Sequence, residues 1–167
     1  MWNLKKIIMA VAAFTLIGCA PVISKDTLKA VDRDIKFEQV VKNPDAYAGK
    51  GVVFGGTILD IENREDVTIL EVLQEGVNSQ LKPVAPEESE GRFLVRFKGF
   101  KDPAVYSKGK HITVAGKIVD AEERKLGKGT YLYPVIEPAE HYLWKRHEYD
   151  RGPSLGIGLG LGYTHID

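Results

Sequence analysis

Apolar and polar side chains alternate through the middle of the chain in the pattern of half-buried β-strands. Five segments rich in Val, Ile, Phe and Tyr are predicted as strands: 51–61, 67–74, 92–98, 111–121 and 130–136. In the clearest segment the inward residues are Phe93, Val95 and Phe97, and the outward residues are Arg92, Arg96 and Lys98. We therefore expect a mainly β fold, a small five-stranded OB-like β-barrel that is closed or nearly closed.

One short helix is predicted ahead of the strands. Phe37, Val40 and Val41 follow the i, i+3, i+4 spacing of a single helical face. Asn43-Pro44 should end this helix, because a residue before proline disfavours the helical region. Residues 75–91 hold two prolines and an acidic run, and we interpret them as a long surface loop.

Residues 43–60 and 102–120 share an internal pattern, with one extra residue in the second copy. In each copy a proline opens a turn, Gly-Lys leads into a strand, and alternate apolar residues face inward. Gly56 and Gly116 fall at equivalent places in mid-strand, where glycine often marks a bend in a barrel. We interpret the copies as equivalent structural devices, while paired functional sites and coincidence remain alternatives.

The first eighteen residues have the pattern of an export signal, with Lys5 and Lys6 followed by the apolar run 7–17. This run would span roughly 16 Å as a helix, well short of a hydrocarbon core of about 30 Å. Residues 16–19, Leu-Ile-Gly-Cys, resemble the lipobox of bacterial lipoproteins, in which the cysteine is acylated and the signal is removed before it. Cys19 is the only cysteine of the chain. A plain signal peptide that ends near a cysteine is the alternative.

The patterns divide the chain into a signal peptide at 1–18, a lipidated tether at 19–34, a barrel domain at 35–150, and a tail at 151–167 in which glycine alternates with Leu and Ile. Ala20 follows the cysteine, and in enteric-type bacteria the absence of aspartate there points to the outer membrane. The tail leaves three interpretations open: a loosely docked terminus, a contact for self-association, or insertion into lipid within an assembly of several chains.

Charge gives little reason to expect a nucleic-acid partner. The chain carries 23 basic and 23 acidic side chains, and removal of residues 1–18 with Lys5 and Lys6 leaves a formal charge of −2. A near-neutral protein gains little long-range attraction for a polyanion. The basic strand face at 92–98 also has its aromatic residues on the opposite side, whereas single-strand binders interleave the two.

No motif identifies a catalytic centre, a metal site or a cofactor. His141 and His147 are six residues apart, which is not a spacing that favours a shared metal, and their segment is interpreted as amphipathic and solvated. Residues 127–130, Gly-Lys-Gly-Thr, lie between strands and are predicted as a hairpin turn. Asp60 and Asp120 are interpreted as turn residues at strand ends rather than as a catalytic pair.

With these motifs in place, residues 10–150 resemble the Slp family of starvation-inducible outer-membrane lipoproteins. Besides the lipobox, the shared features are Asn43-Pro44-x-x-Tyr47-x-Gly49-Lys50, Phe54-Gly55-Gly56, 91–95, Gly99-Phe100-x-Asp102-Pro103, Tyr106, Val114-x-Gly116 and 131–144. The resemblance implies an outer-membrane lipoprotein that is linked to stationary phase or stress and has no assigned catalytic activity. It maps the lipidated position onto Cys19. The tail after Arg151 departs from the aromatic-rich tails of some members.

We therefore expect a non-enzymatic lipoprotein, held by acyl chains such as palmitate on Cys19 and facing the periplasm, whose barrel binds or scaffolds another molecule. The alternative is an OB-type module that binds a small ligand, glycan or oligonucleotide through Arg92, Arg96 and Lys98. An envelope hydrolase is a third hypothesis, and it requires a cleft with convergent titratable groups.

Overall fold

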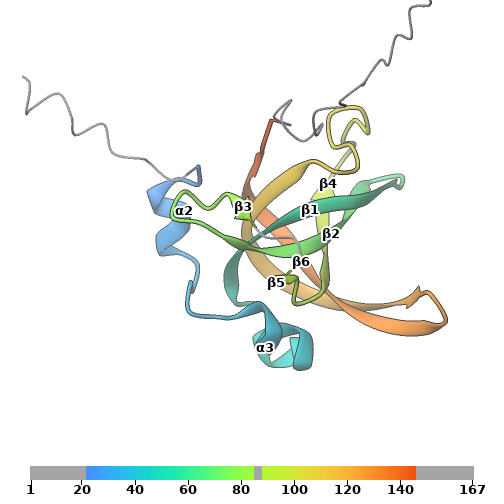
Figure 1. The fold of residues 1–167 in the computed structure, drawn as a ribbon, viewed down its shortest axis with the longest axis horizontal. Coiled ribbons are helices and arrows are strands. Elements are labelled where there is room, and N and C mark those ends of the chain that lie inside the picture. The colour runs from blue at the N-terminus through green and yellow to red at the C-terminus, as the bar shows by residue number, and fades with distance from the viewer. Residues whose placement is uncertain (1–21, 85–87, 146–167) are drawn as a thin grey trace, which may run out of the picture.

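The structure, a computed structural model, describes residues 22–84 and 88–145. Its helices are α2 (Lys25–Lys29), α3 (Phe37–Lys42) and the 3-10 helix η1 (Pro44–Tyr47). Its strands are β1 (Gly51–Asn63), β2 (Val67–Val77), β3 (Pro83–Val84), β4 (Arg92–Lys98), β5 (His111–Leu126) and β6 (Gly129–Leu143) (Figure 1). The predicted helix is confirmed, and Asn43 is its C-terminal cap.

The sheet closes into a five-stranded barrel. Its strand order is β1-β5-β6-β4-β2, and β1 also pairs with β2 to complete the ring. The β4–β6 pair is parallel and the other barrel pairs are antiparallel. The mainly β class and the small barrel are therefore confirmed, and this arrangement is consistent with an OB-like barrel.

The barrel interior holds the main core. Phe93, Val95 and Phe97 point into it and are buried, as the alternation predicts. Phe37 of α3 contributes the cover at one end, with its ring 5.1 Å from that of Phe54 and 5.8 Å from that of Phe93. The inward face of the predicted strands is thus the core of the protein.

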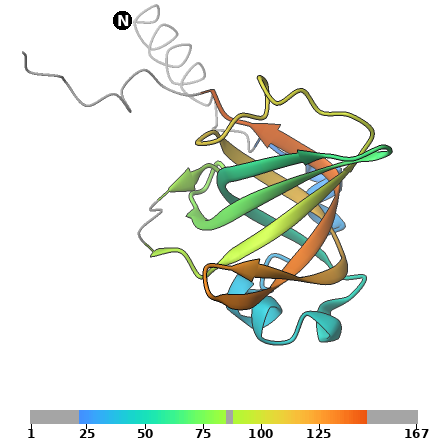
Figure 2. The same cartoon turned by 90° about the vertical axis from the view of Figure 1, so that its right-hand side faces the viewer.

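The two ends of the barrel are closed differently, and we name them for their covers. The α3 end is covered by α3 and η1. The loop end is crossed by residues 99–110, which join β4 to β5, and it also carries the last residues of β6. Figure 2 shows α3 and the 99–110 loop at opposite ends of the barrel.

The internal repeat is built into this barrel as two matched halves. Gly49 and Gly109 both have a left-handed backbone, with φ of 79° and 82°. The N–H of Gly49 donates to the carbonyl of Ile118 at 2.7 Å, and that of Gly109 donates to the carbonyl of Ile58 at 2.8 Å. The two copies therefore begin strands β1 and β5 in the same way, at opposite ends of one antiparallel ladder.

Gly56 and Gly116 also occupy equivalent positions in the structure. A Cβ on Gly56 would lie 1.9 Å from the carbonyl oxygen of Leu73, and one on Gly116 would lie 2.2 Å from that of Glu137. Any side chain would push the neighbouring strand away. This geometry agrees with the interpretation of the two glycines as structural devices that let the strands coil tightly.

The expectation that Asp60 and Asp120 end their strands is wrong. Both strands continue, to Asn63 and Leu126, and the two residues instead follow irregularities in pairing between Ile58 and Asp60 and between Ile118 and Asp120. A bulge bends a strand without ending it, so the ladder continues beyond the closed part of the barrel.

The interpretation of residues 75–91 as one surface loop is also wrong in part. Strand β2 runs on to Val77, and β3 pairs with it. Leu81 is buried against the outer wall of the barrel, together with Ile23 and Ala115. An isolated leucine among polar residues gives no periodic signal, so the sequence alone did not reveal this contact.

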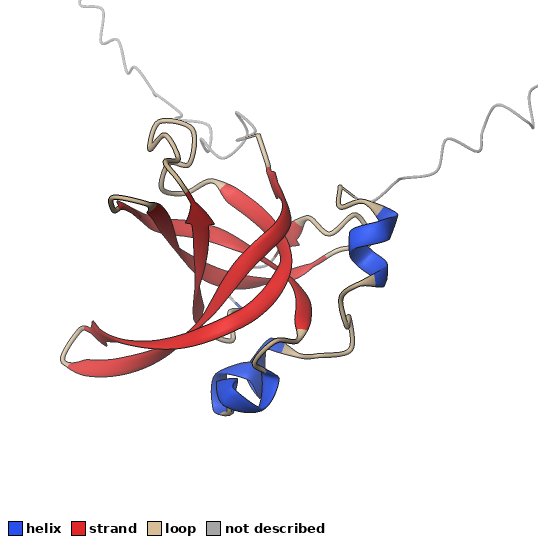
Figure 3. Ribbon diagram, turned by 180° about the vertical axis from the view of Figure 1, so that it is seen from behind, coloured by secondary structure: helices blue, strands red, loops and turns tan. Residues whose placement is uncertain are grey.

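Residues 22–34 lie against the barrel rather than forming an extended tether. Ile23 is 1% exposed, and the Ser24 hydroxyl caps α2. Figure 3 shows α2 beside the barrel wall and above α3. The signal peptide, Cys19 and the tail at 151–167 lie outside the described residues, so the domain boundaries there remain predictions.

Residues 140–143, expected to belong to a solvated amphipathic segment, are part of β6 instead. Pro138 lies within this strand, just beyond the predicted end at residue 136, and proline disfavours a strand assignment from sequence. Among the described residues, none of the helices has the length and apolar character needed to cross a bilayer.

Candidate functional site

The first candidate position, Cys19, lies outside the described residues, so its chemistry remains a prediction from the sequence. The second candidate is the outward basic face of β4, and the structure places its three residues there. Each of the three cations pairs with a carboxylate: Arg92 with Glu71 at 2.7 Å, Arg96 with Asp120 at 3.2 Å, and Lys98 with Glu137 at 3.1 Å. The face is therefore largely neutralised by its own neighbours.

Glu71 is the centre of the most buried of these pairs. It accepts hydrogen bonds from the Arg92 guanidinium and from the Tyr133 hydroxyl, at 2.7 Å and 3.2 Å. The bond to Glu71 raises the pKa of Arg92, and burial raises the pKa of Tyr133. Both groups therefore keep their protons at neutral pH, and Arg92 is already engaged.

Apolar side chains fill the middle of the same outer face. Ile69 and Leu94 point outward from β2 and β4, yet they are buried beneath Tyr133 and Val135 of β6. Sequence alternation assigned this face to solvent. Side chains of the neighbouring strand β6, which pairs with β4 at Val135 and Leu94, cover it instead.

The two hairpins that flank this face are tied together by ion pairs. Arg64 lies 3.8 Å from Glu122, and Arg124 lies 3.6 Å from Glu62. Within each hairpin the same arginines bind Glu62 and Glu122, and the hydrogen bond from Arg64 lowers the pKa of Glu62. The β4 face, where the alternative hypothesis would place an oligonucleotide, is thus flanked by hairpins whose arginines are paired with glutamates.

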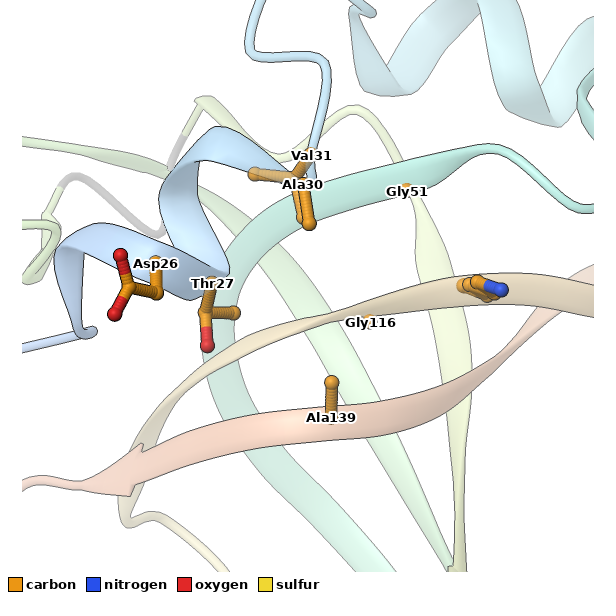
Figure 4. Close-up of a pocket in the computed structure, with 8 residues that line it drawn as sticks. Asp26, Thr27, Ala30, Val31, Gly51, Gly116 and Ala139 are labelled. Carbon is orange, nitrogen blue, oxygen red and sulfur yellow. The ribbon is translucent and has the colours of Figure 1, made fainter.

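A separate hollow of about 310 Å³ lies between α2 and the barrel wall. Figure 4 shows α2 on one side, with β1, β5 and β6 on the other and Ala139 directed toward the helix. Its lining is mostly small and apolar, with Asp26 and Lys117 at the rim. Gly51 and Gly116 let the backbones approach closely here.

A buried carboxylate that the sequence did not single out lies on β2, opposite Gly55 of β1. Glu75 is almost fully buried; one of its oxygens accepts a hydrogen bond from Thr57 at 2.5 Å. The other has no hydrogen-bond partner and lies 3.8 Å from Nε2 of His111. Alternation could not identify Glu75, because the residues that cover it come from elsewhere in the chain.

Thr113 joins two covers of the outer wall. Its hydroxyl donates to the carbonyl of Leu81 at 2.5 Å and accepts from Nε1 of Trp144 at 2.9 Å. The loop that carries Leu81 and the end of β6 are therefore held to β5 by one buried hydroxyl.

At the loop end, His141 packs inside a small aromatic group. Its Nε2 lies 2.9 Å from the Tyr106 hydroxyl, and its ring lies 4.8 Å from that of Phe97. Burial lowers the pKa of His141, and the nearby charge of Lys101 lowers it further. The described residues contain no cluster of three metal-binding side chains. The predicted hairpin turn is formed by Gly127 and Lys128, with Gly127 at a φ of 61°, and Gly129 and Thr130 already belong to β6.

Comparison of the sequence with known proteins finds several relatives. The chain is 29% identical to the uncharacterised lipoprotein YeaY of Escherichia coli over 84% of its length and 72% of the relative. It is 28% identical to the outer membrane protein Slp of Escherichia coli over 67% of its length, and 35% identical to an uncharacterised protein of Haemophilus influenzae over 57%. These two matches cover 59% and 52% of the relatives, little more than half of their lengths.

No solved structure matches the chain. The model of the outer membrane lipoprotein Slp family matches residues 16–158, which include the lipobox cysteine and all the described elements. The chain therefore belongs to the outer membrane lipoprotein Slp family.

Proposed function

We propose that the protein is a non-enzymatic lipoprotein of the outer membrane, held by acyl chains on Cys19 and facing the periplasm, where its barrel serves a binding or scaffolding role linked to stress or stationary phase. The observation that carries this proposal is the position of Cys19. It is the only cysteine, it directly follows an apolar segment of export type, and the folded part of the chain, with α2 at Lys25–Lys29, begins within a few residues of it.

Acylation explains why such a position matters. Each buried CH₂ contributes about 0.8 kcal/mol to membrane binding, so a single chain binds marginally and several chains give a lasting anchor. The barrel itself offers no apolar helix of membrane length among the described residues.

Membrane fractionation of wild type beside Cys19→Ala tests this function. We expect the wild-type protein in the outer-membrane fraction and the variant in the soluble periplasm or as unprocessed precursor. Protease added to intact cells tests orientation, because a periplasm-facing domain stays protected until the outer membrane is permeabilised. A Cys19→Ala protein that remains in the outer membrane would contradict the proposal.

A second function, binding of a small ligand, is favoured by the hollow beside α2 rather than by the β4 face. The hollow is open and apolar, whereas Arg92, Arg96 and Lys98 are already paired. A thermal-shift screen of periplasmic metabolites and glycans would compare wild type with Ala139→Trp, which fills the hollow, and with the double variant Arg92→Ala/Arg96→Ala. A shift lost only in Ala139→Trp supports the hollow, one lost only in the double variant supports the β4 face, and no shift in any protein rejects this function.

A further inference from the structure

The structure fixes how far the folded domain can be from its anchor. Two residues, Ala20 and Pro21, lie between Cys19 and Val22. The Cα atoms of Cys19 and Val22 are thus three steps apart and can be at most about 11 Å apart in any conformation. If residues 19–34 were all extended, the reach would be about 50 Å. The domain therefore has much less freedom at the membrane than the sequence predicts.

The described chain is tied to the wall from its first residues. Ile23 is buried against Leu81 and Ala115. The N–H and the hydroxyl of Ser24 donate to the two carboxylate oxygens of Glu140, at 3.0 Å and 2.7 Å. Glu140 pairs with Ala115 in the sheet, so the chain leaves the wall near that residue.

The direction of the chain at this point favours one end of the barrel. Asp32 donates to the carbonyl of Gly51, at the start of β1 and close to the α3 end. Going back toward the N-terminus, the chain moves away from Gly51 to Glu140 and Ala115. Ala115 lies near the middle of the barrel part of β5, about 13 Å from His111 at the loop end. Toward the N-terminus, the chain is therefore heading to the loop end where the described residues begin.

The loop end also has the side chains that suit a bilayer interface. Phe100 is 71% exposed, Val105 is 47% exposed and Tyr142 is 40% exposed. Tyr142 packs against Trp144 with ring centres 4.8 Å apart, and Lys82 lies over the Trp144 ring at 5.8 Å. Tyrosine and tryptophan are enriched at membrane–water interfaces, and exposed phenylalanine favours the acyl boundary.

The loop that crosses this end is basic, although the adjacent β1–β2 hairpin adds the exposed carboxylates of Glu65 and Asp66. Residues 99–110 contain three lysines, at 101, 108 and 110, and one aspartate, Asp102. Lysine can keep its ammonium in the headgroup layer while its stem covers apolar surface. At the α3 end the equivalent proline, Pro44, is buried, whereas Pro103 is exposed.

We propose that the loop end of the barrel lies against the phospholipid bilayer that holds the acyl anchor, with Phe100, Val105 and Tyr142 in the interface. This inference rests on the proposed acylation of Cys19. The α3 end then points away from the membrane, and the barrel stands on the bilayer in one orientation.

The internal repeat supplies a matched pair of probe positions. Val105 and Ala46 are equivalent in the two copies, both are exposed, and they lie at opposite ends. Val105→Cys and Ala46→Cys would each be purified as the lipoprotein, labelled with a nitroxide, and reconstituted into vesicles of phosphatidylethanolamine and phosphatidylglycerol. Because the Cys19 sulfur is consumed by acylation, the introduced thiol is the labelling site.

We expect the label at 105 to collide several-fold less often with an aqueous nickel chelate than the label at 46. Equal accessibility, or greater protection at 46, would overturn the inference. Protection at 105 that disappears when the protein is diluted in lipid would show contact with a second copy, and would also overturn it. Mass spectrometry of the same samples distinguishes the two failures. An unacylated protein would contradict both the proposed function and this inference. An acylated protein whose two labels are equally accessible would contradict the orientation alone.

Trp144 gives a second measurement without any substitution. The chain has two tryptophans, Trp2 and Trp144, and removal of the signal peptide leaves Trp144 as the only tryptophan, whose emission can be excited selectively. We expect lipids brominated near the headgroup end of the acyl chain to quench its fluorescence in vesicles that contain the wild-type lipoprotein. Absence of quenching would contradict the proposed orientation.

Discussion

The two ends of the barrel have matching glycine turns but different covers. Gly49 and Gly109 turn the chain with nearly equal φ angles, and each donates to the strand that the other copy begins. The α3 end then receives Phe37 as a cover, while the loop end leaves Phe100 exposed. The glycine turns, which both ends share, are what the barrel needs in order to close. The covers differ, so the two ends can contact different molecules.

The largest contrast between the ends should appear in stability. Phe37 is buried against two other phenylalanines, so Phe37→Ala should lower the free energy of unfolding by about 3–5 kcal/mol. Phe100→Ala, the control at the other end, should change it by no more than about 0.5 kcal/mol, as is usual for exposed sites. Urea denaturation of the mature chain with Cys19→Ser measures both. Similar losses would show that the loop end is a second core.

Because the two copies of the repeat use glycine in the same way, adding one methyl group at either glycine should lower the stability of the fold by the same amount. Gly56→Ala and Gly116→Ala should each cost about 3 kcal/mol, because the new Cβ would overlap a carbonyl of the neighbouring strand. Gly76→Ala is the control, since its Cβ would lie 3.9 Å from the nearest atom. The same denaturation measurement applies. If one copy tolerated alanine and the other did not, the two halves would not be equivalent.

A smaller effect should follow from removing the hydroxyl that ties covers to the wall near the loop end. Thr113→Val keeps the shape of the side chain but leaves Nε1 of Trp144 and the carbonyl of Leu81 without their partner. We expect a loss of about 1–3 kcal/mol, together with a changed emission of Trp144. Thr130→Val, on the exposed hairpin, is the control. An unchanged Trp144 spectrum would mean that this hydrogen bond does not hold the end of β6.

The loop end should also be the pH-sensitive end. Burial lowers the pKa of His141 in the folded protein, so the unfolded chain binds a proton at higher pH than the folded chain does. The contribution of neutral His141 to stability is therefore fully present above the unfolded pKa of about 6.5 and is lost as pH falls below it.

Denaturation at several pH values checks this sign. His141→Gln should flatten the dependence between neutral and mildly acidic pH. Tyr106→Phe, which removes the hydrogen-bond partner but keeps the burial, should preserve most of it. A steeper loss of stability in His141→Gln at acidic pH would contradict the expected sign.

The sequence predicted the barrel well because its signal is local. In 92–98 the alternation of apolar and charged residues alone assigns Phe93, Val95 and Phe97 to the core. The repeat could be recognised because both copies need glycine at a left-handed turn and again where strands cross closely. Each requirement is met by one residue type, glycine, at a fixed spacing in the sequence, so the pattern is visible without the structure.

The covers of the outer wall could not be predicted in the same way. Ile23 and Leu81 are single apolar residues in polar segments, and their burial depends on strands far away in the chain. The alternation in 92–98 places the basic side chains outward, but it does not show that Arg92 and Arg96 meet carboxylates from other strands, because that depends on strand register. These contacts join residues that are far apart in the chain, so local sequence patterns do not predict them.

The proposed membrane attachment and the proposed orientation both begin with lipid on Cys19. Mass spectrometry of the mature protein extracted from membranes measures this directly. The account predicts an N-terminal peptide that begins at Cys19 and carries a diacylglyceryl thioether and an amide-linked acyl chain. A peptide that begins elsewhere, or an unmodified Cys19, would contradict it.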